Sequence, residues 1–367
     1  MVIDAVPPKP TPFYFYDLAV LRERVRRAKR AVPATLLFAV KSNPNEAVLK
    51  SLLGEADGLD VASTGEIELA LRCGWRADQL SFTGPAKTNA ALEHAARLGV
   101  LINAESPREL EFLVSLNVGA RVRVRVNPRL VLKAWRVSMT GRPSPFGIDE
   151  EELGGVVPLL RRLDFRGLHM NPGGQCTSVG GFMAAANALV ELASNFELPV
   201  HSLNFGGGWG LTNDAELDIE AVGRKLRDVL GDREALVEPG RWLAAPCGLY
   251  VARVVSQKVS RGTHFVMLDG GMHHHLNATA HLGGEPLPIV NLSRTEGPRV
   301  KRTLVGPLCT PLDTFGEVEL VEPQPGDLIG VRNSGAYGLT FSPTRFLGHE
   351  APAEYVRDED SSSHSAA

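Results

Sequence analysis

Three groups of residues in this sequence have types and positions suited to chemistry, and the first is centred on a lysine. Lys41 directly follows the apolar segment Phe38-Ala39-Val40. An amine at the end of an apolar strand is poorly solvated, which lowers its pKa and favours imine formation with an aldehyde. Considered alone, Lys41 is better explained as a lysine that caps a strand and reaches solvent.

The second group is the glycine run Gly206, Gly207 and Gly208, which follows the apolar segment Ser202–Phe205. Consecutive glycines let several backbone N–H groups turn toward one anion, because no Cβ atom obstructs them. A glycine run by itself is more often a tight turn. Its position at a strand end makes a phosphate site the more informative interpretation.

The third group is Glu238-Pro239-Gly240-Arg241, at the end of the next apolar segment. A carboxylate here can keep the pyridine nitrogen of pyridoxal 5'-phosphate (PLP) protonated, and Arg241 can bind the phosphate in a bidentate manner. A surface ion pair between Glu238 and Arg241 is the alternative. An amine, an anion cradle and an acid at three strand ends together predict a PLP site, with the cofactor held as a Schiff base on Lys41.

The elements that must position these groups form an alternating pattern of strands and amphipathic helices. Helical spacing of apolar residues occurs between the strands, for example in 46–53, 65–73, 89–98 and 107–116. Eight such repeats predict an α/β fold, a (β/α)8 TIM barrel over residues 30–245, whose reactive groups lie at the C-terminal ends of the strands. The eight expected strands are 36–40, 59–62, 80–83, 100–104, 122–126, 165–170, 202–205 and 235–238.

A second, all-β domain is expected after residue 245. Strand-like segments occur at 250–257, 264–268, 300–305 and 327–331, broken by glycine and proline. The early segment 11–17 also resembles a strand, and we expect it to pair with this C-terminal domain. The β-domain is therefore assigned to 1–29 and 246–356, and the polar tail 357–367 is expected to be disordered.

The composition favours a small-molecule enzyme. A net charge of -3, from 39 basic and 42 acidic residues, gives no extended positive field for nucleic acid or a membrane surface. The four cysteines lie far apart without a Cys-x-x-Cys pair, so a reducing cytoplasm is the expected location and a metal site is not. Residues 1–10 do not resemble an export signal.

Several motifs together resemble the fold-type III, alanine racemase-like PLP decarboxylases, which include ornithine and diaminopimelate decarboxylases. The resemblance implies a barrel with a β-domain and a head-to-tail homodimer. It implies that Cys309 reaches the partner's active site and returns a proton to Cα, that Tyr337 contacts the phosphate, and that Asp60, Glu66 and Arg125 line the cofactor pocket. The motifs are 38–43, 58–66, 146–148, 206–208, 238–241, 306–309 and 335–337.

Segments 268–276, 309–313 and 334–340 resemble a narrower subgroup. It includes decarboxylases of carrier-protein-linked glutamyl groups in antibiotic biosynthesis, and relatives associated with exopolysaccharide and protein-sorting systems. Thr310, Asp313 and His273 are the candidate substrate contacts, although Asp313 is better explained as structural. His273, His274 and His275 are expected to point in different directions, which disfavours a metal site.

Two positions depart from the family pattern. The residue after Cys309 is acidic in the ornithine and diaminopimelate enzymes, where it binds the distal amine of the substrate, and here it is Thr310. The family's ring-stacking histidine and phosphate-binding serine are replaced by Asn171 and Gly174. His169 either compensates for the first loss or is a hydrogen-bonded residue of the barrel interior.

The predicted function is PLP-dependent decarboxylation of an amino acid or an amino-acid conjugate, a class that includes substrates linked to a carrier protein. Decarboxylation of free ornithine, lysine or diaminopimelate is the main alternative. A racemase is disfavoured by Glu238 and Cys309, because racemases leave the pyridine nitrogen unprotonated and need a second base. A non-catalytic PLP carrier would lack the β-domain, and an inactive regulator is suggested only by the missing stacking histidine.

Overall fold

The computed structural model describes residues 9–130, 133–279 and 286–358. The chain divides into two compact units, one formed by Arg24–Trp242 and the other by Met1–Glu23 with Leu243–Ala367. Helices α1 (Leu18–Ala31) and α9 (Arg241–Ala244) each cross a boundary between these units. No helix in the described part of the chain is long and apolar enough to cross a membrane.

The larger unit is a closed barrel of eight parallel strands, as the sequence predicted. Pairing runs from β5 through β4, β3, β2, β12, β11 and β9 to β6, and the pairing of β5 with β6 closes the ring. Each expected strand is present within about a residue of its predicted position. The strands are β2 (Thr35–Ala39), β3 (Gly58–Val61), β4 (Leu80–Phe82), β5 (Leu101–Ala104), β6 (Arg121–Asn127), β9 (Asp164–His169), β11 (Ser202–Asn204) and β12 (Glu234–Val237).

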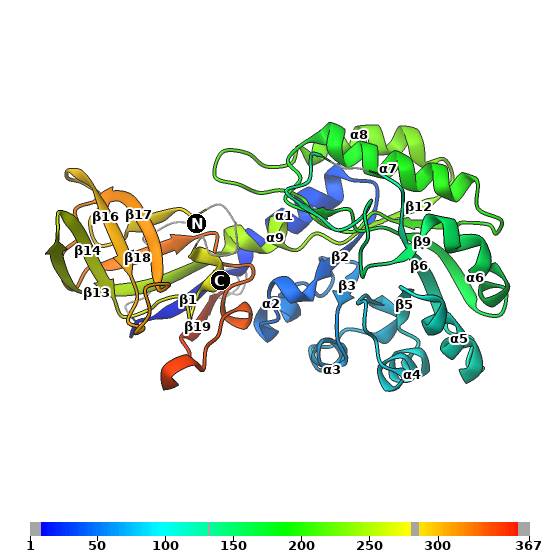
Figure 1. Ribbon diagram of the computed structural model, residues 1–367, viewed down its shortest axis with the longest axis horizontal. Coiled ribbons are helices and arrows are strands. Elements are labelled where there is room, and N and C mark those ends of the chain that lie inside the picture. The colour runs from blue at the N-terminus through cyan, green and yellow to red at the C-terminus, as the bar shows by residue number, and fades with distance from the viewer. Residues whose placement is uncertain (1–8, 131–132, 280–285, 359–367) are drawn as a thin grey trace, which may run out of the picture. The chain divides into compact units, whose positions relative to one another are not determined.

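Helices surround the ring of strands (Figure 1). Most begin at a residue whose side chain accepts from a backbone N–H of the first turn, such as Ser63 before α3 and Asp218 before α8. Their apolar faces pack on the outer side chains of the strands. The helices are α2 (Glu46–Ser51), α3 (Thr64–Arg72), α4 (Asn89–Leu98), α5 (Pro107–Leu116), α6 (Leu153–Leu160), α7 (Val179–Ser194) and α8 (Ile219–Leu230).

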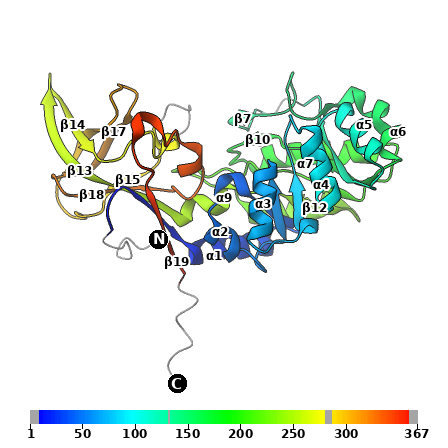
Figure 2. The same cartoon turned by 90° about the horizontal axis from the view of Figure 1, so that it is seen from below.

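Three two-residue strands in the barrel unit were not predicted. β7 (Val137–Ser138) pairs antiparallel with β10 (Gly173–Gly174), and β8 (Ile148–Asp149) adds to β6. Figure 2 shows β7 and β10 next to each other beside the barrel. The ladder connects a segment that follows β6 to a segment that follows β9.

The smaller unit is mostly β-structure. The predicted early strand is present and pairs antiparallel with β13 and parallel with β19. Phe13, Phe15, Leu249 and Val251 form its buried core cluster. The strands are β1 (Phe13–Asp17), β13 (Gly248–Ser260), β14 (Thr263–Leu268), β15 (Ile289–Asn291), β16 (Arg299–Val305), β17 (Thr314–Val321), β18 (Leu328–Arg332) and β19 (Ala353–Arg357).

The prediction that the disordered tail begins at residue 357 is wrong for residues 357 and 358. Arg357 is the last residue of β19, and its guanidinium pairs with Asp17, while Asp358 accepts from Arg22 Nη2 at 2.7 Å. Residues 357 and 358 are ordered because they form ion pairs with residues near the start of the chain, which their polar composition does not indicate. The remainder of the predicted tail, 359–367, lies outside the described residues.

Candidate active site

Lys41 lies in a short 3₁₀ turn, Val40–Ser42, that directly follows β2. Its Nζ pairs with the carboxylate of Asp60 on the neighbouring strand β3. The Lys41 side chain remains 39% exposed, whereas Asp60 is fully buried. Burial raises the pKa of Asp60, the nearby Glu238 adds to that effect, and Lys41 opposes it. The amine is therefore accessible to a small molecule while a buried carboxylate orients it.

Glu238 is a buried, ionised carboxylate at the end of β12. Asn204 Nδ2 donates to Oε1 at 2.6 Å, and His169 Nε2 lies 3.3 Å from Oε2. Burial by itself would raise the pKa of Glu238, but His169, Lys41 and Asn204 together lower it to about 2. Such a carboxylate stays charged at neutral pH and can stabilise a proton on a ring nitrogen.

The glycine run packs too tightly for any other residue. A Cβ on Gly207 would lie 2.3 Å from the Glu238 carbonyl oxygen, and one on Gly208 would lie 2.1 Å from the Gly173 carbonyl oxygen. Gly206 and Gly208 also have φ values of 65° and 73°. Within the described chain no acceptor is found for the N–H groups of Gly207 and Gly208. These donors can therefore bind an anion.

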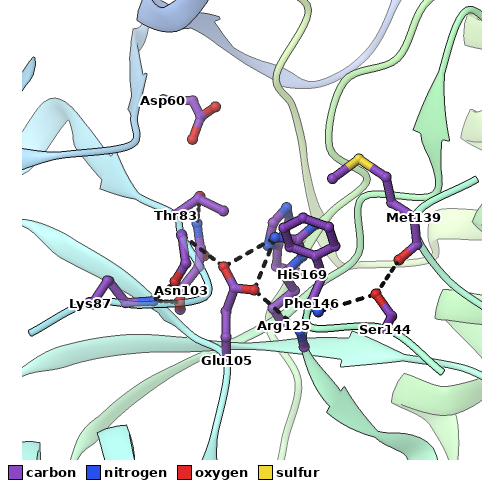
Figure 3. Close-up of polar contacts among 12 residues, drawn as sticks. Asp60, Thr83, Lys87, Asn103, Glu105, Arg125, Met139, Ser144, Phe146 and His169 are labelled. Carbon is purple, nitrogen blue, oxygen red and sulfur yellow. Dashed lines mark hydrogen bonds and ion pairs between the residues drawn. The ribbon is translucent and has the colours of Figure 1, made fainter. Parts of the chain in front are cut away.

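Arg125 has unused donors inside the same end of the barrel. Its Nη1 donates to both oxygens of Glu105 at 3.1 Å, and its guanidinium carbon lies 4.8 Å from the centre of the Phe146 ring. Its Nε and Nη2 are buried without a partner among the described residues. Figure 3 shows Arg125 beside Glu105, with Asn103 on one side and Phe146 on the other. Buried orphan donors of this kind are expected where a ligand accepts from them.

Sequence reasoning missed three supporting residues. Glu105 also accepts from the N–H groups of Gly84 at 2.8 Å and Gly147 at 3.2 Å, and Asn204 holds Glu238. Both Glu105 and Asn204 lie at strand ends, the same signal that identified Lys41. Lys87, also missed, is buried and pairs with Glu109 at 2.9 Å. Because that pair occupies its amine, Lys87 does not compete with Lys41.

The structure also locates His169, Asn171 and Gly174, the residues of the barrel departure from the family pattern. His169 is fully buried on β9 beside Glu238, which is an interior position of the barrel. Asn171 Oδ1 accepts from Gly173 N at 3.3 Å, and Gly174 pairs with Val137 in the short ladder. Gly240 packs against Ser42, where a Cβ would lie 2.9 Å from Ser42 Cβ. Arg241 begins helix α9.

The remaining candidates lie in the β-unit. Cys309 is an exposed free thiol, Thr310 is half-buried, and Tyr337 lies in a turn with φ 53°. The Asp313 carboxylate is buried and accepts from Met272 N at 2.6 Å and Leu308 N at 2.8 Å. Because both oxygens bind backbone N–H groups, Asp313 braces the loop that carries Cys309.

The histidine run differs from the expectation. His273 and His274 do not point apart, since their ring centres are 3.6 Å apart, and the ring of His349 lies 4.7 Å from that of His273. His275 Nε2 lies 2.9 Å from Ser334 Oγ. The run follows β14 in a turn rather than in an extended strand, so alternation does not apply. Across the described ranges, no group of three or more His, Cys, Asp or Glu side chains could hold a metal ion.

The fold and these groups define a barrel enzyme that uses PLP. An accessible amine, unpaired backbone N–H groups, orphan guanidinium donors and an ionised glutamate converge at the C-terminal ends of the strands, as the aldehyde, the phosphate and the ring nitrogen of PLP require. The residues present therefore fit the cofactor.

Comparison with known proteins gives the family. Residues 18–245 match the model of the pyridoxal-dependent decarboxylase, pyridoxal binding domain. The L-glutamyl-[BtrI acyl-carrier protein] decarboxylase of Niallia circulans is 35% identical, covering 95% of this chain and 89% of the relative. The diaminopimelate decarboxylase of Deinococcus radiodurans is 34% identical, covering 94% and 90%.

A solved structure of the diaminopimelate decarboxylase of Helicobacter pylori, complexed with L-lysine, superimposes with a TM-score of 0.88 at 25% identity, covering 96% of this chain and 92% of that one. The chain belongs to the pyridoxal-dependent decarboxylases. It is a PLP-dependent carboxy-lyase that acts on an amino acid or an amino-acid conjugate.

Proposed function

We propose that this enzyme decarboxylates an amino acid whose side chain is acidic, conjugated or attached to a carrier protein, and not a free amino acid with a distal ammonium group. The observation that carries the proposal is the side chain after Cys309. Thr310 offers a hydroxyl, and the nearby Asp313 carboxylate is buried and already bonded to Met272 N and Leu308 N. A buried ammonium without a carboxylate partner is strongly disfavoured.

The relatives are consistent with this proposal but do not choose between the substrates. One of them acts on a glutamyl group of an acyl-carrier protein, and others act on diaminopimelate, at nearly equal identity. The Thr310 argument favours the first kind of substrate. Decarboxylation of a free basic amino acid is the second candidate, supported by the number of diaminopimelate decarboxylases among the relatives.

For the chemistry, we assign Lys41 as the amine that holds PLP and Asp60 as the residue that orients it. In this assignment, the backbone of Gly206, Gly207 and Gly208 binds the phosphate. Gly240, Arg241 and Tyr337 are further cofactor contacts. When bound, PLP supplies an electron sink for the bond to the departing carboxylate.

We assign Glu238 to keep the pyridine nitrogen protonated. Its low pKa suits that role, because the carboxylate stays negatively charged. In the same assignment, His169 and Asn204 keep Glu238 charged and fixed in position. The Nε and Nη2 groups of Arg125, which have no partner among the described residues, are assigned to bind a polar group of the cofactor or the substrate. His273 is kept as a candidate substrate contact, because both of its buried ring nitrogens have no partner within the described residues.

Cys309 is to return the proton to Cα across a homodimer interface, as the family resemblance implies. Its thiol is exposed, which suits a residue that acts in a partner's site. We also assign the enzyme to the cytoplasm, which is supported by four free cysteines in the described chain.

A CO2-release screen tests the substrate proposal. The wild-type holoenzyme is incubated with free glutamate, side-chain-conjugated glutamate, carrier-linked glutamate, ornithine, lysine and diaminopimelate. We expect the acidic or conjugated substrates to have the highest kcat/KM. Thr310→Asp is expected to raise kcat/KM for lysine or ornithine by at least about tenfold relative to the native substrate, because it supplies the missing counter-charge.

Thr310→Asn is the matched control, because it changes the side chain at the same position without adding a charge. Efficient turnover of free lysine or ornithine by the wild type would refute the proposal and establish the second candidate.

A further inference from the structure

A cavity of about 650 Å³ lies at the end of the barrel opposite to the catalytic residues. Apart from Arg76 and Asp78, its lining residues are among the first three residues of the ring strands or the residue just before each strand. Thr35 begins β2, Arg121 begins β6 and Glu234 begins β12. Lys41, Glu238 and the glycine run all follow the C-terminal ends of their strands, so this cavity is separate from the PLP site.

Strand β6 brings three arginines to one face. Its sequence alternates arginine and valine from Arg121 to Val126, and alternate side chains of a strand share a face. Arg125 lies at the catalytic end and pairs with Glu105. Arg123 Nε donates to Ser202 Oγ on β11 at 3.1 Å, and β9 lies between β6 and β11 in the ring. Arg121 and Arg123 line one cavity together with residues of, or just before, all the other strands of the ring, so the arginine face points inward.

The acidic residues that line the cavity are mostly paired already. Asp164 accepts from Arg166 at 2.6 Å, and Asp78 lies 2.9 Å from Arg76. Asp57 lies 2.6 Å from Lys29. Glu234 has no ion pair with any described residue, but its carboxylate accepts from the Thr35 hydroxyl at 3.1 Å.

Arg121 and Arg123 are different, because neither has a carboxylate within ion-pair distance among the described residues. Arg121 Nη1 donates to the Gly99 carbonyl oxygen at 3.2 Å, and Arg123 bonds only to Ser202. The two Cα atoms are about 7 Å apart, as residues i and i+2 of a strand are. The lining has four arginines and four carboxylates, but among the described residues only Arg121 and Arg123 on one side and Glu234 on the other have no ion pair.

Burial makes the missing ion pair of Arg123 significant. Arg123 is only 6% exposed, and burial lowers its pKa to about 10, while Glu234 and Glu238 partly oppose that effect. Arg123 lines the cavity, and its Nη groups have no acceptor in the described chain. A buried cation of this kind is stabilised when an anion enters beside it. Ser81 and Gln79, which also line the cavity, add neutral hydrogen-bonding groups.

We propose that this cavity is a second binding site, separate from the active site, for a small organic anion that carries a carboxylate or phosphate group, held between Arg121 and Arg123. A volume of about 650 Å³ accommodates a metabolite-sized molecule. The proposal does not depend on the substrate of the decarboxylase, because none of the residues that carry it belongs to the PLP site.

Isothermal titration of the PLP-saturated holoenzyme tests the site, in a buffer without phosphate or carboxylate. Saturation with PLP keeps the phosphate cradle of the active site occupied. Inorganic phosphate and succinate are the two probes, and the tighter one assigns the chemistry of the ligand. We expect saturable binding of at least one probe, with one equivalent per chain, and a rise of the melting temperature on binding.

Arg123→Met keeps the length and packing of the stem but removes the charge, and is expected to weaken binding at least tenfold. Arg121→Gln is the second variant, so that a folding defect at the buried position does not decide the result. Arg97→Gln, on the outside of α4, is the matched control and is expected to bind like the wild type. The proposal is overturned if neither probe binds the wild type saturably, or if both cavity variants bind with unchanged affinity.

Discussion

Replacing Glu238 by Gln tests the central electrostatic assignment of the site. Glutamine keeps the size of the side chain and can still bond to Asn204 and His169, but it cannot stay negative beside a protonated ring nitrogen. Two opposite charges about 4 Å apart attract by about 4 kcal/mol at an effective dielectric of 20. Loss of that attraction in the transition state corresponds to about a thousandfold lower kcat.

The effect of Asn204→Ala should be much smaller, and the contrast separates a direct role from a positioning role. A hydrogen bond to a charged group contributes roughly 1.5 to 3 kcal/mol, so its loss should raise the pKa of Glu238 by about one to two pH units. Glu238 would still be ionised at pH 7. We therefore expect less than about a tenfold loss of kcat at pH 7, together with an acid limb of the rate profile that moves to higher pH.

Steady-state CO2 release between pH 4 and pH 9 measures both effects, and the absorbance of bound PLP verifies cofactor occupancy. Glu93→Gln, an exposed residue on α4, is the control for the same chemical change away from the site. A Glu238→Gln enzyme that binds PLP and retains a near-native kcat would show that the ring nitrogen does not depend on this carboxylate.

Two further changes test the amine and the thiol. Lys41→Ala is expected to abolish both the PLP absorbance band and activity, while Lys50→Ala on the surface of α2 leaves both unchanged; a borohydride-reducible adduct in the Lys41 variant would contradict the assignment. Mixing inactive Lys41→Ala and Cys309→Ala proteins is expected to restore up to about a quarter of the wild-type activity through heterodimers with one intact site. No recovery after verified subunit exchange would locate Cys309 outside the partner's site.

Much of the barrel could be predicted from the sequence because most strands are short, largely apolar segments followed by a helix with regular spacing. Lys41 and Glu238 were found because reactive groups lie at strand ends in barrels. The ladder between β7 and β10 could not be found in this way, since each of its strands has only two residues, too few to give a periodic pattern. The order of residues 357 and 358 depends on ion pairs to the start of the chain, which no local pattern reveals.

The pairing of side chains was harder to predict, because partners come from strands far apart in the sequence. The alternation of arginine and valine in β6 is visible in the sequence, but Arg123 bonds to Ser202, 79 residues later. That contact follows only when the ring order of β6, β9 and β11 is known. The unpaired charge in the cavity is therefore a property of the closed barrel and not of any single segment.

The role of His169 depends on strand register in the same way. The sequence allowed it to replace the missing stacking histidine or to lie in the barrel interior. In the barrel, His169 on β9 is paired with Asn204 on β11, and Asn204 is paired with Leu236 on β12, two residues before Glu238. Leu236 and Glu238 are two residues apart, so their side chains are on the same face. The side chains of His169, Asn204 and Glu238 therefore converge inside the ring. Three adjacent strands thus bring His169 and Asn204 to the two oxygens of Glu238, and together these residues lower its pKa despite its burial.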